Sequence, residues 1–261
     1  MDLALGLRHG PHSDIAMRAG ALLSPKRLAP VSVNYHSRIV FDGDAIGNNE
    51  FGCCWPADTM RRAQLRMAWA WGSGWKPTAP LTLALYSGIT GFDPVTGQPD
   101  IGTLPADGQN YVAANGIYVG LQAPDGGYPV ALDHTKPDLL NWATDEFCGV
   151  GLQFALPLAW QDVIQAGGTV LDVPSGGLSS PGGKPDGWGG HQWGSGRYDA
   201  QGRRYVISWG LEYVVTPEAM AAYCIGASSE MSRSWLDATG RTPLGMNWDD
   251  ALAALRGAAV A

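Results

Sequence analysis

The residues most able to do chemistry in this sequence are a cysteine and a distant histidine. Cys54 stands just ahead of a segment with helical spacing, and His191 follows a long glycine-rich stretch. A thiol attacks a carbonyl only as the thiolate, and a helix N-terminus or a neighbouring imidazolium lowers its pKa. We therefore expect Cys54 to be the most reactive thiol of the chain. We also expect a ring nitrogen of His191 to lie within about 4 Å of its Sγ.

The segment that must position Cys54 is predicted to be a helix. Met60, Ala63 and Met67 recur at helical spacing, and Pro56 suits a first helical turn. A glycine-rich stretch after residue 71 ends the pattern. The sequence therefore places the Cys54 thiol at or just before a helix N-terminus.

The second half of the chain is predicted to be rich in strands. Residues 150–156 alternate as a strand does, and strands over 193–198 and 203–209 bracket a turn. Thr216 and Pro217 are typical of a helix start. The other predicted elements are a helix over 137–147, a strand or helix over 81–86, loop over most of 88–108, and irregular structure over 167–190.

This order of elements predicts an α+β fold with two lobes. We expect an N-terminal arm over 1–40 and a helix-rich lobe over 41–147 that carries Cys54. A β-rich lobe over 148–261 carries His191, and the whole forms one integrated domain. With 36 glycines and 18 prolines, a loop-rich globule is favoured over a helical bundle.

The flanking residues resemble those of papain-like cysteine peptidases. Residues 48–55, Asn-Asn-Glu-Phe-Gly-Cys-Cys-Trp, have a glycine two places before Cys54, a tryptophan after it and an amide six places upstream. Gly-Gly-His at 189–191 and Tyr-Val-Ile-Ser-Trp-Gly at 205–210 resemble the segments around the family's histidine and its Asn-Ser-Trp-Gly. The chain is also similar to a divergent papain-fold group of uncharacterised bacterial and phage proteins. The resemblance implies a papain-like two-lobe architecture, and it gives Asn48 the oxyanion role that a glutamine has in the family.

The sequence departs from the family at the third catalytic position. Ile207 stands where the family has the asparagine that orients the imidazole, and isoleucine accepts no hydrogen bond. Any activity must then use a Cys–His dyad or another orienting group. We expect that group to come from the 167–190 loop. Ser208 follows Ile207 on the strand, so its side chain is expected to point to the opposite face.

Two functions are consistent with these residues. The first is a thiol hydrolase, a peptidase or amidase acting on peptide or peptidoglycan amide bonds, with Cys54, His191 and Asn48 as site residues. The alternative is a catalytically weak or inactive papain-fold protein with a structural or binding role, such as a bacteriophage virion component. The retained cysteine, histidine and amide favour the first, and the missing asparagine favours the second.

Composition excludes several other classes. The net charge of −7 and pI near 5.1 argue against nucleic acid as a partner. The chain has neither a run of about 18 apolar residues nor a basic, apolar start, so we expect no membrane segment, no signal peptide, and a cytoplasmic or virion-associated protein. The four scattered cysteines predict no disulfide framework and no zinc site, and we expect no cofactor.

Overall fold

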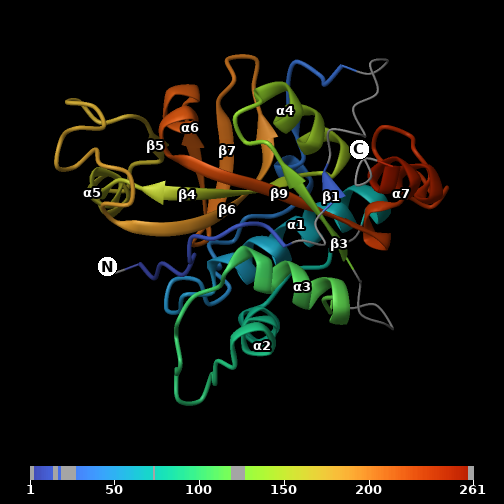
Figure 1. Cartoon of the computed structure of the whole chain (residues 1–261), viewed down its shortest axis with the longest axis horizontal. Helices are drawn as coiled ribbons and strands as arrows, with labels where there is room; N and C mark the ends of the chain where they lie inside the picture. The colour runs from blue at the N-terminus through green and yellow to red at the C-terminus, as the bar shows by residue number, and fades with distance from the viewer. Residues whose placement is uncertain (1–2, 14–16, 19–27, 73, 119–126, 258–261) are drawn as a thin grey trace.

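A single mixed sheet and seven α-helices form the framework of the described chain. The computed structural model describes residues 3–13, 17–18, 28–72, 74–118 and 127–257. Within these residues, the sheet has nine strands. Figure 1 shows the sheet across the middle of the molecule, with α2 and α3 on one side and α4 and α6 on the other.

Three helices make up the helical side. They are α1 (Cys54–Trp71), α2 (Ala79–Thr90) and α3 (Pro105–Asn115). Proline occupies the first turn of α2 and α3, where its missing N–H costs nothing, and α1 and α2 end at left-handed glycines, Gly72 and Gly91. The segment over 81–86 therefore lies within a helix, and α1 begins at Cys54 as the spacing predicts. Residues 105–108, expected to be loop, belong to α3.

The strands come mainly from the second half of the chain. Their path through the sheet is β1-β3-β9-β4-β6-β7-β8-β5, with β2 paired to β6 off this path. The bounds are β1 Met17–Arg18, β2 Val33–Asn34, β3 Gly127–Leu132, β4 Val150–Leu156, β5 Val170–Leu171, β6 Gly189–Tyr198, β7 Arg204–Ser208, β8 Leu211–Val215 and β9 Cys224–Ser232. The predicted strands over 150–156, 193–198 and 203–209 correspond to β4, β6 and β7.

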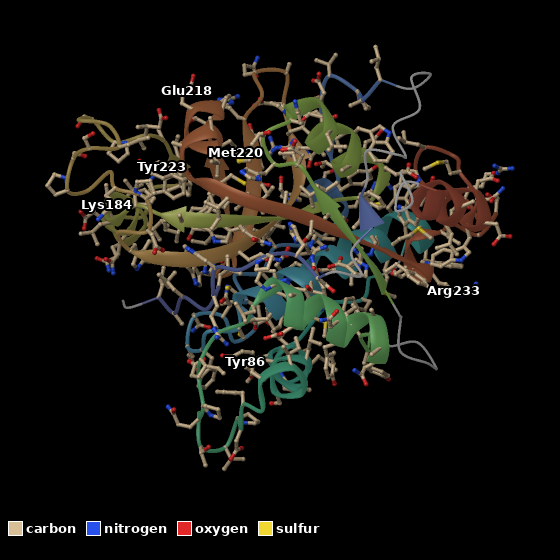
Figure 2. The ribbon with its side chains drawn as sticks, in the orientation of Figure 1. Tyr86, Lys184, Glu218, Met220, Tyr223 and Arg233 are labelled. Atoms are coloured by element: carbon tan, nitrogen blue, oxygen red, sulfur yellow. The ribbon has the colours of Figure 1, made fainter. Side chains whose placement is uncertain are left out.

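The remaining helices cover the sheet or its ends. They are α4 (Pro137–Glu146), α5 (Leu158–Gln165), α6 (Pro217–Tyr223), α7 (Trp248–Gly257), and the 3-10 turns η2 (His36–Arg38) and η3 (Arg233–Trp235). Thr216 caps α6 as predicted, because its side chain accepts a hydrogen bond from the Ala219 N–H. Tyr223, labelled in Figure 2, ends α6 and donates its hydroxyl to the Gly183 carbonyl at 2.8 Å, which ties the glycine-rich loop to this helix.

The two largest groups of buried side chains lie on different sides of the fold, one with the sheet and one with the helices α1–α3. The larger group joins the strands to α4 and α6, and the smaller one lies among α1, α2 and α3. β3 and α4, which precede residue 148, contribute to the larger group. Between the two groups runs the contact of α1 with β6, where Cys54 and His191 are found.

Candidate active site

Cys54 is the first residue of α1 and is completely buried. Burial raises the pKa of its thiol to about 12, because a buried thiolate loses its hydration. Backbone hydrogen bonding from Gln192 and Gly6 opposes this rise but does not cancel it. The expectation of a depressed pKa from the helix N-terminus is therefore wrong for this closed arrangement, because desolvation is the larger effect.

His191 lies on β6, opposite Phe154 of β4, and is also completely buried. Burial holds the pKa of its imidazole well below the usual value, so the ring is neutral at pH 7. Its Nε2 is 2.8 Å from Ser208 Oγ. Its Nδ1 is buried and has no hydrogen-bond partner among the described residues. A hydrogen bond to the Cys54 thiol is therefore not formed in this structure.

Ser208 contacts the imidazole, and two predictions about it are wrong. The side chain was expected to point away from His191, and the orienting group was expected from the 167–190 loop. Instead, Ser208 pairs with Leu211 across a two-residue turn at the end of β7, and its Oγ faces the ring. Ile207, at the family's asparagine position, pairs with Gly194 further along β6. The hydrogen-bonding role falls one residue later than the aligned motif indicates.

The turn after Ser208 brings Trp209 over the histidine. Trp209 and Gly210 have φ of 49° and 79°, the left-handed pair that a two-residue hairpin requires. The Trp209 ring stacks on the His191 ring, with centroids 4.4 Å apart. Gly210 is needed for space as well as for φ, since a Cβ there would lie 2.2 Å from the Gly43 carbonyl oxygen. Because the indole of Trp209 is stacked on the imidazole, it screens one face of that ring from water.

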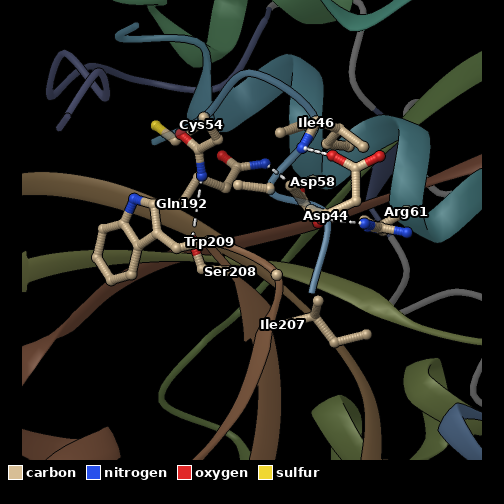
Figure 3. A pocket seen from close by; sticks show the side chains of 13 residues that line it. Asp44, Ile46, Cys54, Asp58, Arg61, Gln192, Ile207, Ser208 and Trp209 are labelled. Atoms are coloured by element: carbon tan, nitrogen blue, oxygen red, sulfur yellow. Dashed lines mark hydrogen bonds between the residues drawn. The ribbon is translucent and has the colours of Figure 1, made fainter. Parts of the chain in front are cut away.

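Asn48 lies in the loop before α1 and is buried. Its Nδ2 donates to Ser208 Oγ at 3.1 Å, and its Oδ1 has no partner among the described residues. Asn48, Cys54 and Ser208 line one small cavity of about 10 Å³, enough for a single water molecule. Figure 3 shows Cys54 at the start of its helix with Ser208 and Trp209 facing it from the end of β7.

A buried ionic network beside Cys54 was missed by the sequence reasoning. Asp58, one turn along α1, accepts from Arg62 Nε at 2.9 Å and from Gln192 Nε2 at 2.5 Å, and Arg62 also pairs with Glu230 of β9. These groups are almost completely buried, and burial raises the pKa of Asp58. The i, i+4 spacing of Asp58 and Arg62 was the available signal. The network fixes α1 against β6 and β9.

The N-terminal residues run through the region between the helices and the sheet. The Leu7 N–H donates to the Gly190 carbonyl at 3.2 Å, directly before His191. The Arg8 N–H donates to the Thr103 carbonyl at 3.0 Å, and the Thr103 N–H donates to the Gly6 carbonyl at 2.7 Å. This segment, residues 5–8, lies between the two sides of the fold and is hereafter the cleft segment.

Glycines allow the cleft segment to approach so closely. A Cβ on Gly6 would lie 1.8 Å from the Gly52 carbonyl oxygen, and one on Gly190 would lie 2.4 Å from the Leu7 carbonyl oxygen. A Cβ on Gly102 would likewise lie 2.4 Å from the Gly6 carbonyl oxygen. The sequence shows these glycines but not their mutual contacts, so the expected arm over 1–40 carried no hint of this position.

A second, larger cavity has a volume of about 410 Å³. Leu3, Ile164 and Tyr213 are among the residues that line it, and Trp209 lines both cavities. Such a volume is within the range of small-molecule and side-chain binding sites. Elsewhere among the described residues, no three His, Cys, Asp or Glu side chains gather as metal ligands.

Comparison with solved structures identifies the architecture. No protein-family model and no curated protein matches this sequence. Xylellain, a cysteine protease from Xylella fastidiosa, superposes with a TM-score of 0.61 at 12% identity, over 87% of this chain and 96% of xylellain. Digestive procathepsin L 3 from the larval midgut of Tenebrio molitor gives a TM-score of 0.55 at 15% identity, over 85% of this chain and 75% of that one. This chain has the papain-like fold.

The papain-like fold confirms the predicted α+β class and the expected resemblance. Its two sides are α1–α3 and the antiparallel core of the sheet, and the candidate residues lie where these sides meet. Within the described ranges, every helix is too short or too polar to cross a membrane.

Proposed function

We propose that this protein is a thiol hydrolase that cleaves peptide-type amide bonds, with Cys54 as nucleophile and His191 as acid–base group. The observation that carries the proposal is the position of Cys54 at the first residue of α1, packed against the β6 strand that holds His191, on a papain-like fold. Asn48 and Ser208 line the same small cavity as the thiol.

The reaction follows from the chemistry of these groups. Nδ1 of His191 takes the Cys54 proton, and the thiolate forms a C–S bond to the substrate carbonyl carbon. The imidazolium then protonates the leaving amine as the C–N bond breaks, which leaves a thioester. Water, deprotonated by the same imidazole, attacks the thioester, so that the acid leaves and the Cys54 thiol is restored.

The oxyanion of the tetrahedral intermediate needs two donors. The Cys54 backbone N–H lies at the free N-terminus of α1, and Asn48 Nδ2 has a second hydrogen besides the one given to Ser208. One oxyanion donor typically contributes about 3–4 kcal/mol to transition-state stabilisation.

Before any reaction, the substrate must gain access to the buried Cys54 and His191. Cys54 and His191 are both inaccessible, and the cleft segment lies beside them. Burial raises the pKa of the thiol and lowers that of the imidazole. Opening the site to water would reverse both shifts and so favour the thiolate–imidazolium pair.

The test uses the full chain, a set of fluorogenic peptide amides and a peptidyl epoxide that alkylates active thiols. We expect Cys54→Ala to abolish both hydrolysis and labelling, with a loss of at least about a thousandfold in kcat/KM. The matched control is Cys53→Ala, because Cys53 packs among Tyr86 and Phe92 instead of the candidate site. Peptide mapping that finds the label on another cysteine would contradict the assignment.

A non-catalytic binding role is the second candidate. The specific observation in its favour is that both reactive groups are buried in their neutral forms. A structural component of a bacteriophage virion, or a protein that binds peptidoglycan without cleaving it, would not need an ionised thiol or imidazole. It is favoured if the folded protein neither hydrolyses the peptide set nor reacts with the epoxide.

A further inference from the structure

Among the described residues, Ser208 Oγ is the only atom that forms a hydrogen bond with the ring of His191, and it also links the ring to Asn48. The distances are 2.8 Å to His191 Nε2 and 3.1 Å to Asn48 Nδ2. Ser208 is 6% exposed, so water does not readily replace either bond.

The hydrogen count at Ser208 restricts what the bond to the ring can be. A hydroxyl has one hydrogen and two lone pairs, and Asn48 Nδ2 can only donate to it. The second lone pair can accept an Nε2–H, which leaves Nδ1 without a proton and able to act as a base. The hydroxyl can instead donate to a bare Nε2, which puts the ring proton on Nδ1 and leaves it unable to accept one.

We propose that Ser208 is the positioning residue of His191 and holds the tautomer that carries its proton on Nε2. It takes the role that the missing asparagine has in the resembling family, one residue further along the strand than Ile207. This inference rests on the proposed hydrolase function for its kinetic consequence, but the tautomer of His191 is a property of the folded protein in either case.

The surroundings support an acceptor role for the hydroxyl. With Nε2–H donating to Oγ, the hydroxyl hydrogen needs an acceptor of its own. A water molecule in the small cavity that Ser208 and Asn48 both line can accept it, while Asn48 Nδ2 keeps its hydrogen bond to Oγ. Trp209, stacked on the ring with centroids 4.4 Å apart, restricts rotation of the imidazole about its Cβ–Cγ bond.

The test combines a spectroscopic and a kinetic measurement on matched variants. Ser208→Thr keeps the hydroxyl, and Ser208→Val has the same shape without it. Long-range ¹H–¹⁵N spectra at pH 7 report which ring nitrogen of His191 is protonated. We expect the Nε2–H form in the wild type and Ser208→Thr, and a mixed population in Ser208→Val and Ser208→Ala.

The kinetic arm separates positioning from folding. Ser208→Val should lower kcat by at least about tenfold with a smaller change in KM, and Ser208→Thr should restore most of the rate. Ser195→Ala is the control, because Ser195 is a buried serine of β6 whose hydroxyl bonds only to the Arg197 carbonyl in the described set. If the Ala variant fails to fold, the Val and Thr pair supplies the same comparison.

The outcomes distinguish the two proposals. A His191 tautomer that is unchanged in Ser208→Val, or an Nδ1–H form in the wild type, overturns the role of Ser208 even if the protein is a hydrolase. A tautomer that shifts only when the hydroxyl is lost supports the role, even if the wild type hydrolyses no peptide. In that second case the proposed function fails and the positioning of His191 stands.

Discussion

At the scale of single residues, burial decides the charge of both candidate groups. The buried thiol keeps its proton and the buried imidazole stays neutral, so the pair stores no ion-pair energy in the closed form. For this reason the pH dependence of stability reports on the same groups that the proposed reaction uses.

We predict that His191 makes the protein less stable on acidification. In the unfolded chain the imidazole takes up a proton below about pH 6.5, whereas in the folded chain burial keeps it neutral to lower pH. The unfolded state then binds more protons, so the stabilising contribution is present in full above the unfolded pKa and is lost as pH falls toward the folded pKa. The slope approaches about 1.4 kcal/mol per pH unit for this one group.

Urea unfolding at pH 7.5, 6.5 and 5.5 measures the slope. His191→Asn should flatten it by up to the amount just given, while the part due to buried His36, whose pKa burial also lowers, remains. His134→Asn, a half-exposed histidine before α4, serves as the control variant. Equal slopes in wild type and His191→Asn would contradict the buried neutral imidazole.

At the scale of elements, the hairpin between β7 and β8 sets the position of Ser208 and Trp209. Its two-residue turn requires φ above zero at both central residues, and only one of these is a glycine. A tryptophan in the left-handed region is strained, and such strain persists where the surroundings hold it.

We predict that Gly210→Ala is more destabilising than an ordinary glycine substitution. Its new Cβ would meet the Gly43 backbone oxygen at 2.2 Å in addition to the unfavourable φ, and backbone cannot move aside as a side chain can. The expected loss is more than about 2 kcal/mol of unfolding free energy. Gly240→Ala, at φ 74° with nothing within 4 Å of its Cβ, should cost only about 1 kcal/mol. Thermal or urea unfolding of the two variants measures the loss of unfolding free energy in each. Equal losses would refute the steric argument.

The same hairpin shows where sequence reasoning succeeds and where it stops. The β7 strand before the turn and the helix start at Cys54 follow from alternation, helical spacing and Pro56, which are local properties, whereas β8 after the turn was not predicted. The contact of Ser208 with His191 was missed because the prediction placed Ile207 at the family's asparagine position and let the next side chain point to the opposite face. The actual contact depends on the sheet register and on the left-handed turn at Trp209. The depth of burial at Cys54 depends on chain that packs over it from far away, and no local pattern encodes that.

At the scale of the whole molecule, the cleft segment joins the two sides of the fold. Gly6 and Arg8 bond to Thr103 on the helical side, while Leu7 bonds to Gly190 on the sheet. Leu7 is buried in the smaller core group and Leu5 packs against the larger one, so the segment's departure costs the contacts of these two side chains, while the other members of both groups keep theirs.

We predict that Gly6→Ala opens the candidate site without unfolding the protein. A Cβ at 1.8 Å from the Gly52 oxygen cannot be accommodated, so the cleft segment must leave its position. Iodoacetamide should then modify Cys54 at least about tenfold faster than in the wild type, because a hydrated thiol ionises more readily. Peptide mapping over time gives the rate for each cysteine.

Gly10→Ala is the matched control in the same stretch, since its Cβ meets only the end of the Leu104 side chain at 3.0 Å. Near-ultraviolet circular dichroism checks that both variants keep their packed aromatic cores. An unchanged rate at Cys54 in Gly6→Ala, with the fold intact, would show that the cleft segment does not restrict access.

The cleft segment also has a consequence for biosynthesis. The first of its partners to be made is Thr103, and the second, Gly190, follows far later in the chain. At ordinary rates of translation, the ribosome needs on the order of 10 s or more between Leu7 and Gly190. Throughout that interval the cleft segment lacks its partner on β6, and Cys54 lacks the strand against which it is buried. A thiol that is completely buried in the finished protein is therefore exposed to oxidants and chaperones during synthesis.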